Sequence, residues 1–170
     1  NPASARILPM DTKPLETIEI ATGPAPSASV IWMHGLGADG HDFEMVFIPD
    51  ADRFDPLFFN LTPHEAESMT PHQRLVLQES WKALEDAGYN PMTLAGQAVS
   101  LYVGAEPGGY HHDSFTGSSE AIIASRLSYF LDLKGPAMVV NTGCSSSAVA
   151  IHQACESLRH GESRMALAGG

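Results

Sequence analysis

The sequence predicts an α/β protein with a largely parallel β-sheet. Short apolar runs alternate along the chain with longer segments in which apolar residues recur at helical spacing, and strands that alternate with helices favour a parallel sheet. The 170 residues fit one ordinary domain. Hydrophobic residues make up 44% of the chain and charged residues 17%, which is typical of a globular protein rather than a disordered one.

The N-terminal part of the chain predicts two strands after an irregular arm. Residues 1–14 hold three prolines and no clear period, so we expect a loose arm there. Residues 15–22, "LETIEIAT", alternate apolar and polar side chains, which favours a strand. The run "SVIWMHG", residues 29–35, predicts a buried strand that leads into the Gly-rich turn "GLGADG", residues 35–40.

A boundary is expected near residues 48–56, where Asp, Pro and aromatic residues follow one another without a period. We therefore divide the chain into an opening segment, residues 1–50, and a main unit, residues 51–170. Gly170 closes the letters "MALAGG", which look like the opening of a buried strand. We expect the sequence to be a piece of a longer protein.

Two threonine–proline pairs predict helix starts in the main unit. Thr62 is followed by Pro-His-Glu and Thr70 by Pro-His-Gln, which is the form of a capping box with proline at the first helical position. From Gln73 onward, apolar residues fall near one helical face, and Gly88 is a good stop. The apolar residues of this predicted face are Leu75, Leu77, Trp81, Leu84 and Ala87.

The remaining pattern alternates strands with helices as far as Gly170. In order, it predicts a strand over 98–106, a loop over 107–119, a helix over 120–133, a strand within 134–140, a helix over 145–160 and a last strand from 165 to 168.

Composition excludes several classes of protein. A formal net charge of −11 with nine scattered Lys and Arg residues argues against nucleic acid as a partner. No apolar run is long enough to cross a membrane, and no signal peptide is apparent. Cys144 and Cys155 give neither a disulfide framework nor zinc spacing, so a reducing, cytoplasmic location is expected.

The candidate catalytic residue is Cys144, which lies between the predicted strand at 134–140 and the predicted helix at 145–160. The N-terminus of a helix supplies unpaired N–H groups and positive potential, which stabilise a thiolate and can hold the oxyanion formed when a thioester is attacked. The small residues after it leave room for a long, thin substrate. A buried structural thiol is the alternative, and spacing alone does not decide between the two.

The letters around this thiol resemble a known family. The stretches "RFDPLFFNLTPHEAESMTPHQRLVLQESWKALEDAGYNP" and "SRLSYFLDLKGPAMVVNTGCSSSAVAIHQACESLRHGESRMALAGG" are similar to the N-terminal half of a β-ketoacyl synthase, the ketosynthase domain of modular polyketide synthases. The resemblance covers about 120 of the 170 residues, from about residue 50 to residue 170, and both stretches are long and specific.

This resemblance implies a partial thiolase-like fold, one half of a domain, that acts as a homodimer. It implies that Cys144 takes an acyl chain from the phosphopantetheine arm of an acyl carrier protein and condenses it with a malonyl unit after decarboxylation, with no cofactor bound to the chain itself. The backbone N–H of Cys144 would be one oxyanion donor. Residues 117–140 would lie near the dimer interface and the acyl tunnel.

The sequence departs from the family in two ways. Asn141, Thr142 and Gly143 stand where the family usually has Asp, Thr and Ala before the cysteine. The family's two catalytic histidines, in a His-Gly-Thr-Gly-Thr block and a later Gly-His, belong to a C-terminal half, and none of the eight histidines here has such a context. We therefore expect the C-terminal half to be a missing partner and the chain alone to be incomplete for condensation.

The opening segment resembles a different enzyme. Residues 13–47, with "IWMHGLGADGHDF", are similar to the start of an α/β-hydrolase of the carboxylesterase and acyl-protein thioesterase group. There the backbone of the Gly-rich turn, here Gly35 and Leu36, contributes to the oxyanion hole. A serine hydrolase also needs a G-x-S-x-G elbow, and "GCSSS" and "GESRM" both lack the closing glycine. The segment could instead replace the first strand of the ketosynthase in a chimera, or be poorly ordered.

Three further points follow from the sequence. The stretch "YHHDSF", residues 110–115, has adjacent histidines that point in different directions in an extended loop, so we predict no metal site. Beside the ketosynthase and the esterase or thioesterase, a third possibility is a non-catalytic module that dimerises or docks a carrier protein. Cys155 lies among apolar residues of a predicted helix, and we expect it in the core.

Overall fold

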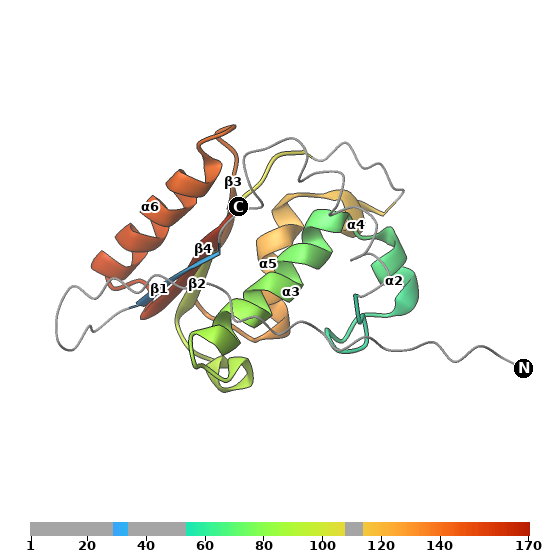
Figure 1. The fold of residues 1–170 in the computed structure, drawn as a ribbon, viewed down its shortest axis with the longest axis horizontal. Coiled ribbons are helices and arrows are strands. Elements are labelled where there is room, and N and C mark those ends of the chain that lie inside the picture. The colour runs from blue at the N-terminus through green and yellow to red at the C-terminus, as the bar shows by residue number, and fades with distance from the viewer. Residues whose placement is uncertain (1–28, 34–53, 108–113) are drawn as a thin grey trace, which may run out of the picture.

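The computed structural model describes residues 29–33, 54–107 and 114–170 (Figure 1). Its elements, in chain order, are β1 (Ser29–Met33), α2 (Pro63–Ser68), α3 (Pro71–Asp86), the 3-10 helix η2 (Pro91–Leu94), β2 (Val99–Gly104), α4 (Phe115–Ser118), α5 (Ala121–Phe130), β3 (Ala137–Val140), α6 (Ser146–Arg159) and β4 (Met165–Gly169).

The described strands form one sheet in the order β1-β4-β2-β3, and every neighbouring pair is parallel. Helix α6 covers one face of the sheet, while α3 and α5 cover the other (Figure 1). The predicted α/β class and parallel sheet are confirmed. The strand expected at 29–35 is present as β1, which pairs with β4 from Ser29↔Met165 to Met33↔Gly169. The strand expected at 15–22 and the turn at 35–40 lie outside the described residues.

The alternation of side chains along β2 and β4 divides the core in two. On the α3 and α5 side, β2 contributes Val99, Leu101 and Val103 to a large apolar cluster. On the α6 side, both the sheet and the helix present mainly alanines, together with Tyr102. Because alanine side chains are short, α6 lies close against the sheet. This close packing determines where the N-terminus of α6, and therefore Cys144, is placed.

Both predicted threonine caps are confirmed. The Thr62 hydroxyl accepts a hydrogen bond from the backbone N–H of Glu65 at 3.1 Å, and α2 begins at the next residue, Pro63. The Thr70 hydroxyl accepts from the N–H of Gln73 at 3.4 Å, at the start of α3. Each cap satisfies one of the N–H groups that a helix N-terminus otherwise leaves unpaired.

The buried face of α3 differs from the predicted face. Leu77 and Leu84 are buried as expected, but Leu75 is half-buried and Ala87 is exposed. Two polar residues are buried on the same face, Gln73 four positions before Leu77 and Ser80 between the two leucines. The predicted face is therefore confirmed at Leu77, Leu84 and Trp81, which is half-buried against the apolar cluster, and wrong at Ala87. The predicted stop is correct, because Gly88 adopts a φ of +80° and its N–H donates to the carbonyl of Glu85.

The loop predicted at 107–119 contains the short helix α4, and this part of the prediction is wrong. The Ser114 hydroxyl caps α4 by accepting from the N–H of Gly117 at 3.1 Å. The side-chain amide of Gln73 donates to the carbonyls of Thr116 and Gly117 at 3.0 and 3.1 Å. A partner more than 40 positions earlier in the chain thus holds this turn in place.

Arg126 of α5 ties these parts together. Its guanidinium donates to the side-chain oxygen of Gln73 at 2.6 Å, to the carboxylate of Glu65 at 2.7 Å and to the carbonyl of Thr116 at 3.1 Å. The Arg126 side chain is only 10% exposed. The capping-box pattern assigned the side chains of Glu65 and Gln73 to local caps, but both contact Arg126 in a shared polar network, and the Thr70 N–H donates to the carbonyl of Gly117 rather than to Gln73.

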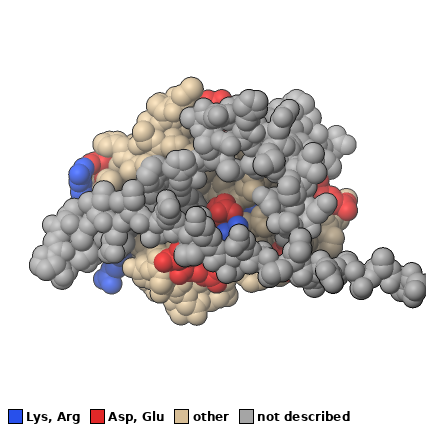
Figure 2. Space-filling model, in the orientation of Figure 1, with Lys and Arg blue, Asp and Glu red and all other residues tan. Residues whose placement is uncertain are grey.

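The surface agrees with the acidic composition. On the face in Figure 2, the described basic side chains lie singly or in small groups, and no continuous basic surface is visible among the described residues. Within the same ranges, no helix is both long and apolar enough to cross a membrane.

Candidate active site

Cys144 lies on the turn that joins β3 to α6. Strand β3 ends at Val140, α6 begins at Ser146, and the thiol between them is exposed. The predicted order of strand, turn, thiol and helix is therefore confirmed. The alternative of a buried structural thiol is wrong for this residue.

The turn before the thiol depends on a glycine. Gly143 has a φ of +63°, a backbone conformation that other L-residues adopt only with strain. Its N–H donates to the Asn141 side-chain oxygen at 3.1 Å, and its carbonyl accepts from the N–H of Ser146 at 2.9 Å. The glycine that departs from the family pattern is thus the residue that reverses the chain and places Cys144 outside the sheet.

Close backbone contacts hold the first turn of α6 against the ends of β2 and β4. A Cβ placed on Gly104, the last residue of β2, would lie 2.7 Å from the carbonyl carbon of Ser146 and 2.8 Å from the nitrogen of Ser147. A Cβ on Gly170 would lie 2.2 Å from the carbonyl oxygen of Gly104. The Ser147 hydroxyl also donates to the carbonyl of Gly170. The sequence alone does not predict the close approach between Gly104 and Gly170.

The chemistry that this arrangement supports is nucleophilic. An exposed thiol stands one residue before the N-cap of a 14-residue helix, where helix N–H groups and the helix dipole favour negative charge. The adjacent hydroxyls make local hydrogen bonds, as that of Ser145 does to the carbonyl and hydroxyl oxygens of Thr142, both at 2.9 Å. The turn therefore presents an exposed thiol with little side-chain bulk beside the N-terminus of α6.

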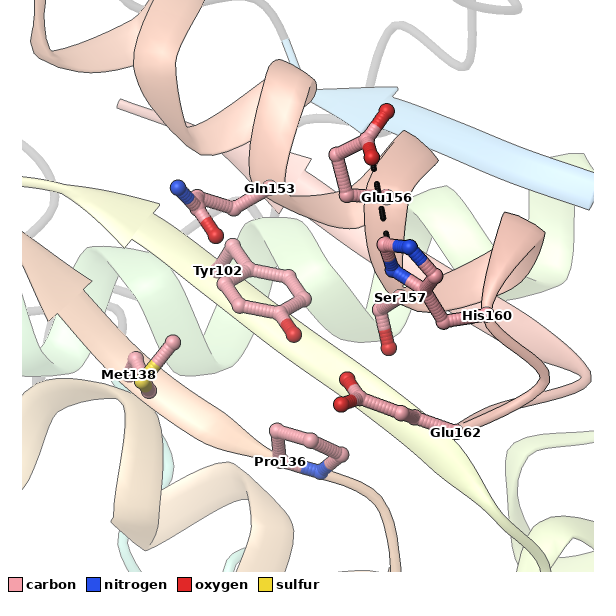
Figure 3. A pocket seen from close by; sticks show the side chains of 8 residues that line it. All are labelled: Tyr102, Pro136, Met138, Gln153, Glu156, Ser157, His160 and Glu162. Carbon is pink, nitrogen blue, oxygen red and sulfur yellow. Dashed lines mark ion pairs between the residues drawn. The ribbon is translucent and has the colours of Figure 1, made fainter.

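A hollow of about 440 Å³ lies at the other end of α6 (Figure 3). Its lining residues are Tyr102, Pro136, Met138, Gln153, Glu156, Ser157, His160 and Glu162, and Cys144 is not among them. A hydrogen bond from Arg159 lowers the pKa of the Glu156 carboxyl from its ordinary value. Because this hollow is at the far end of the helix, it does not form part of the thiol site.

The other predicted residues are less informative. Cys155, expected in the core, is half-buried in α6. The hydrolase-like turn residues Gly35 and Leu36, and residues 110–113 of "YHHDSF", lie outside the described residues. Within 29–33, 54–107 and 114–170, no group of three or more His, Cys, Asp or Glu side chains could hold a metal ion.

A protein-family model described as "Beta-ketoacyl synthase, N-terminal domain" matches residues 35–170. The match begins at Gly35, so residues 35–40 belong to the ketosynthase match and the resemblance of this turn to an α/β-hydrolase is not supported. The chain is 51% identical over 129 residues to polyketide synthase PksM of Bacillus subtilis, covering 73% of this chain and 3% of that protein. It is 47% identical over 132 residues to cyclo-acetoacetyl-L-tryptophan synthase of Aspergillus oryzae, covering 71% of this chain and 3% of that protein.

Solved structures agree with these sequence relatives. The ketosynthase from module 6 of the bacillaene synthase of Bacillus subtilis 168 is 48% identical, with a TM-score of 0.65 over 71% of this chain and 22% of that chain. An oxazolomycin ketosynthase domain of Streptomyces albus is 38% identical, with a TM-score of 0.59 over 64% of this chain and 20% of that chain. The chain thus spans only a small part of each relative that it matches.

Proposed function

The chain belongs to the β-ketoacyl synthase family, and on that premise we propose that it forms the acyl-accepting part of a ketosynthase in a polyketide synthase. The exposed thiol of Cys144, on the turn between β3 and α6, is the observation that carries this proposal. An acyl-accepting nucleophile needs access to the substrate, which this exposure supports, and a nearby backbone donor, for which we propose the N–H of Cys144 itself.

The proposed reaction is a transfer between thioesters. The Cys144 sulfur attacks the carbonyl carbon of an acyl group on the phosphopantetheine arm of an acyl carrier protein. A new C–S bond forms while the carbonyl oxygen becomes an oxyanion, which the backbone N–H of Cys144 stabilises. When the oxyanion collapses, the C–S bond to the arm breaks, and the pantetheine thiolate leaves and takes up the proton that Cys144 lost. No external cofactor is needed for this step.

Condensation with a malonyl unit requires more than these residues. In the family, two histidines of the C-terminal half assist decarboxylation and condensation, and the sequence here contains no His-Gly-Thr-Gly-Thr block. We therefore assign acyl transfer to the residues around Cys144 and decarboxylative condensation to the domain completed by its C-terminal half.

We also propose that the domain works as a homodimer through residues 117–140. Strand β3 stands at one end of the described strand order, and Met138 on it is 44% exposed. Tyr129 is 87% exposed on α5 in the same segment. In the ketosynthase that contains this chain, Met138→Lys should shift the species seen by sedimentation from dimer to monomer. Met92→Lys, at a methionine that is 57% exposed in η2, is the matched control and should leave the dimer intact.

For the opening segment we propose a structural role. Residues 29–33 form the parallel β1–β4 pair, which supports a role for this segment as an added strand of the ketosynthase sheet. Amide hydrogen exchange tests this role, because a paired strand should be protected. Fast exchange throughout 29–33 would contradict it.

The proposed function is tested by intact mass spectrometry after incubation with an acyl N-acetylcysteamine thioester. One acyl adduct is expected; Cys144→Ala should abolish it and Cys155→Ala should retain it. Absence of the adduct from the unsubstituted protein would reject the proposal. Turnover of a p-nitrophenyl ester that survives Cys144→Ala would support a hydrolase instead, and a stable dimer with neither activity would support a non-catalytic module.

A further inference from the structure

Ser146 is the residue whose side chain closes the turn that carries Cys144. It is 6% exposed, although both of its neighbours in sequence toward the N-terminus are exposed. Its hydroxyl accepts a hydrogen bond from the N–H of Thr142 at 2.9 Å and donates one to the carbonyl of Gly143 at 2.7 Å. The Ser146 hydroxyl therefore links the start of α6, after Cys144, to Thr142 and Gly143, the two residues before Cys144.

Contacts with the ends of β2 and β4 hold the first turn of α6, which carries Ser146. The backbone of Ser146 and Ser147 lies so close to Gly104 that a Cβ atom at residue 104 would clash with it. The hydroxyl of Ser147 adds a hydrogen bond to the carbonyl of Gly170. The first turn of α6 thus has little freedom to shift, and the Ser146 hydroxyl extends this restraint to the backbone on the other side of Cys144.

We propose that Ser146 is a positioning residue that sets the orientation of the Cys144 thiol for attack on a thioester. The inference rests on the proposed function, since it concerns the geometry of that reaction. Acyl transfer needs the sulfur and the oxyanion donor at Cys144 aligned with one carbonyl group, and a displacement of about 1 Å can cost on the order of 100-fold in rate. Alkylation of the same thiol by a small haloacetamide needs only access.

The adjacent serine provides a matched control. The Ser145 hydroxyl also makes two hydrogen bonds, to the carbonyl and hydroxyl oxygens of Thr142. Ser145 is exposed, however, so water can replace its hydroxyl when the side chain is removed. If burial of the Ser146 hydroxyl is what matters, the two alanine variants should differ.

The experiment compares Ser146→Ala with Ser145→Ala in the ketosynthase that contains this chain. Acylation by an acyl N-acetylcysteamine thioester and alkylation by iodoacetamide are timed by intact mass on separate portions of the same folded preparation. For Ser146→Ala we expect the acylation rate at saturating thioester to fall by about tenfold or more, with the half-saturating concentration and the alkylation rate changed less than about twofold. Ser145→Ala should keep both rates near those of the unsubstituted protein.

The outcomes separate the two proposals. Failure of the unsubstituted protein to become acylated would reject the proposed function, and the role of Ser146 with it. Normal acylation of the unsubstituted protein together with normal acylation of Ser146→Ala would reject only the role of Ser146. If Ser146→Ala loses acylation and alkylation equally, the substitution damages the turn in general. If Ser146→Ala and Ser145→Ala have equal effects, burial of the Ser146 hydroxyl is not what matters. Either result overturns the proposal that Ser146 positions the thiol.

Discussion

The substitution Gly104→Ala tests whether close packing between β2 and α6 holds the thiol in place. The new Cβ would lie 2.7 Å from the carbonyl carbon of Ser146. Because non-bonded carbon atoms prefer about 3.5–4.0 Å, the start of α6 would have to move by about 1 Å. Such overpacking typically costs about 1–3 kcal/mol in the free energy of unfolding. A shift of that size at a nucleophile can also cost on the order of 100-fold in rate.

The matched control for Gly104→Ala is Gly88→Ala. A Cβ on Gly88 would meet nothing within 4 Å, but its φ of +80° makes alanine unfavourable by about 1–2 kcal/mol. Both variants should therefore lose stability to a similar degree in urea denaturation. Only Gly104→Ala should slow acylation of Cys144, measured by intact mass. Acylation of Gly104→Ala within twofold of the unsubstituted rate would refute the reasoning, as would equal slowing in Gly88→Ala.

Three further variants test the scaffold. Arg126→Met should lower the free energy of unfolding by about 2–3 kcal/mol in urea denaturation, since it removes charged hydrogen bonds from a largely buried site. Its control, Lys82→Met, breaks an exposed ion pair and should lower the free energy of unfolding by less than about 1 kcal/mol. Thr70→Ala should cost about 1 kcal/mol by removing the cap of α3, and Thr70→Ser should restore most of it in the same assay. The lowered pKa of Glu156 means that its pairing with Arg159 stabilises the folded state above the ordinary carboxyl pKa and is lost as pH falls through the lowered value. Arg159→Gln should raise the Glu156 pKa toward its ordinary value in a carbon-13 NMR titration, and an unchanged value would contradict the assignment.

Features that depend on neighbours in sequence could be predicted. The caps at Thr62 and Thr70 involve atoms only three positions apart, so the letters alone contain both partners. The stop at Gly88 and the joint at Cys144 are equally local, because each follows from a short run next to a helix terminus. For the same reason the order of helices and strands from residue 54 onward was largely correct.

Features that depend on distant partners could not be predicted in the same way. The sequence predicts a loop at helix α4 because its four residues, FTGS, are too few to show a helical period, and hydrogen bonds from Gln73 and Arg126 help to hold it. Both donors belong to other helices, and nothing in their own local pattern indicates this use. The local pattern predicts Gln73 as a capping residue at a helix start, whereas in the structure its side chain is a buried polar link between α3, α4 and α5.

The three serines after Cys144 show where local pattern stops being informative. In the letters "CSSS" they are equivalent, and all three hydroxyls make hydrogen bonds. Their places in the fold make them different, because Ser146 lies against Gly104 of β2 and is buried. Ser145 stays exposed and Ser147 is half-buried beside Gly170. The position of the Cys144 thiol can be predicted from the neighbouring sequence. The burial of Ser146, which we propose orients that thiol, depends on β2, which ends at Gly104, far earlier in the chain.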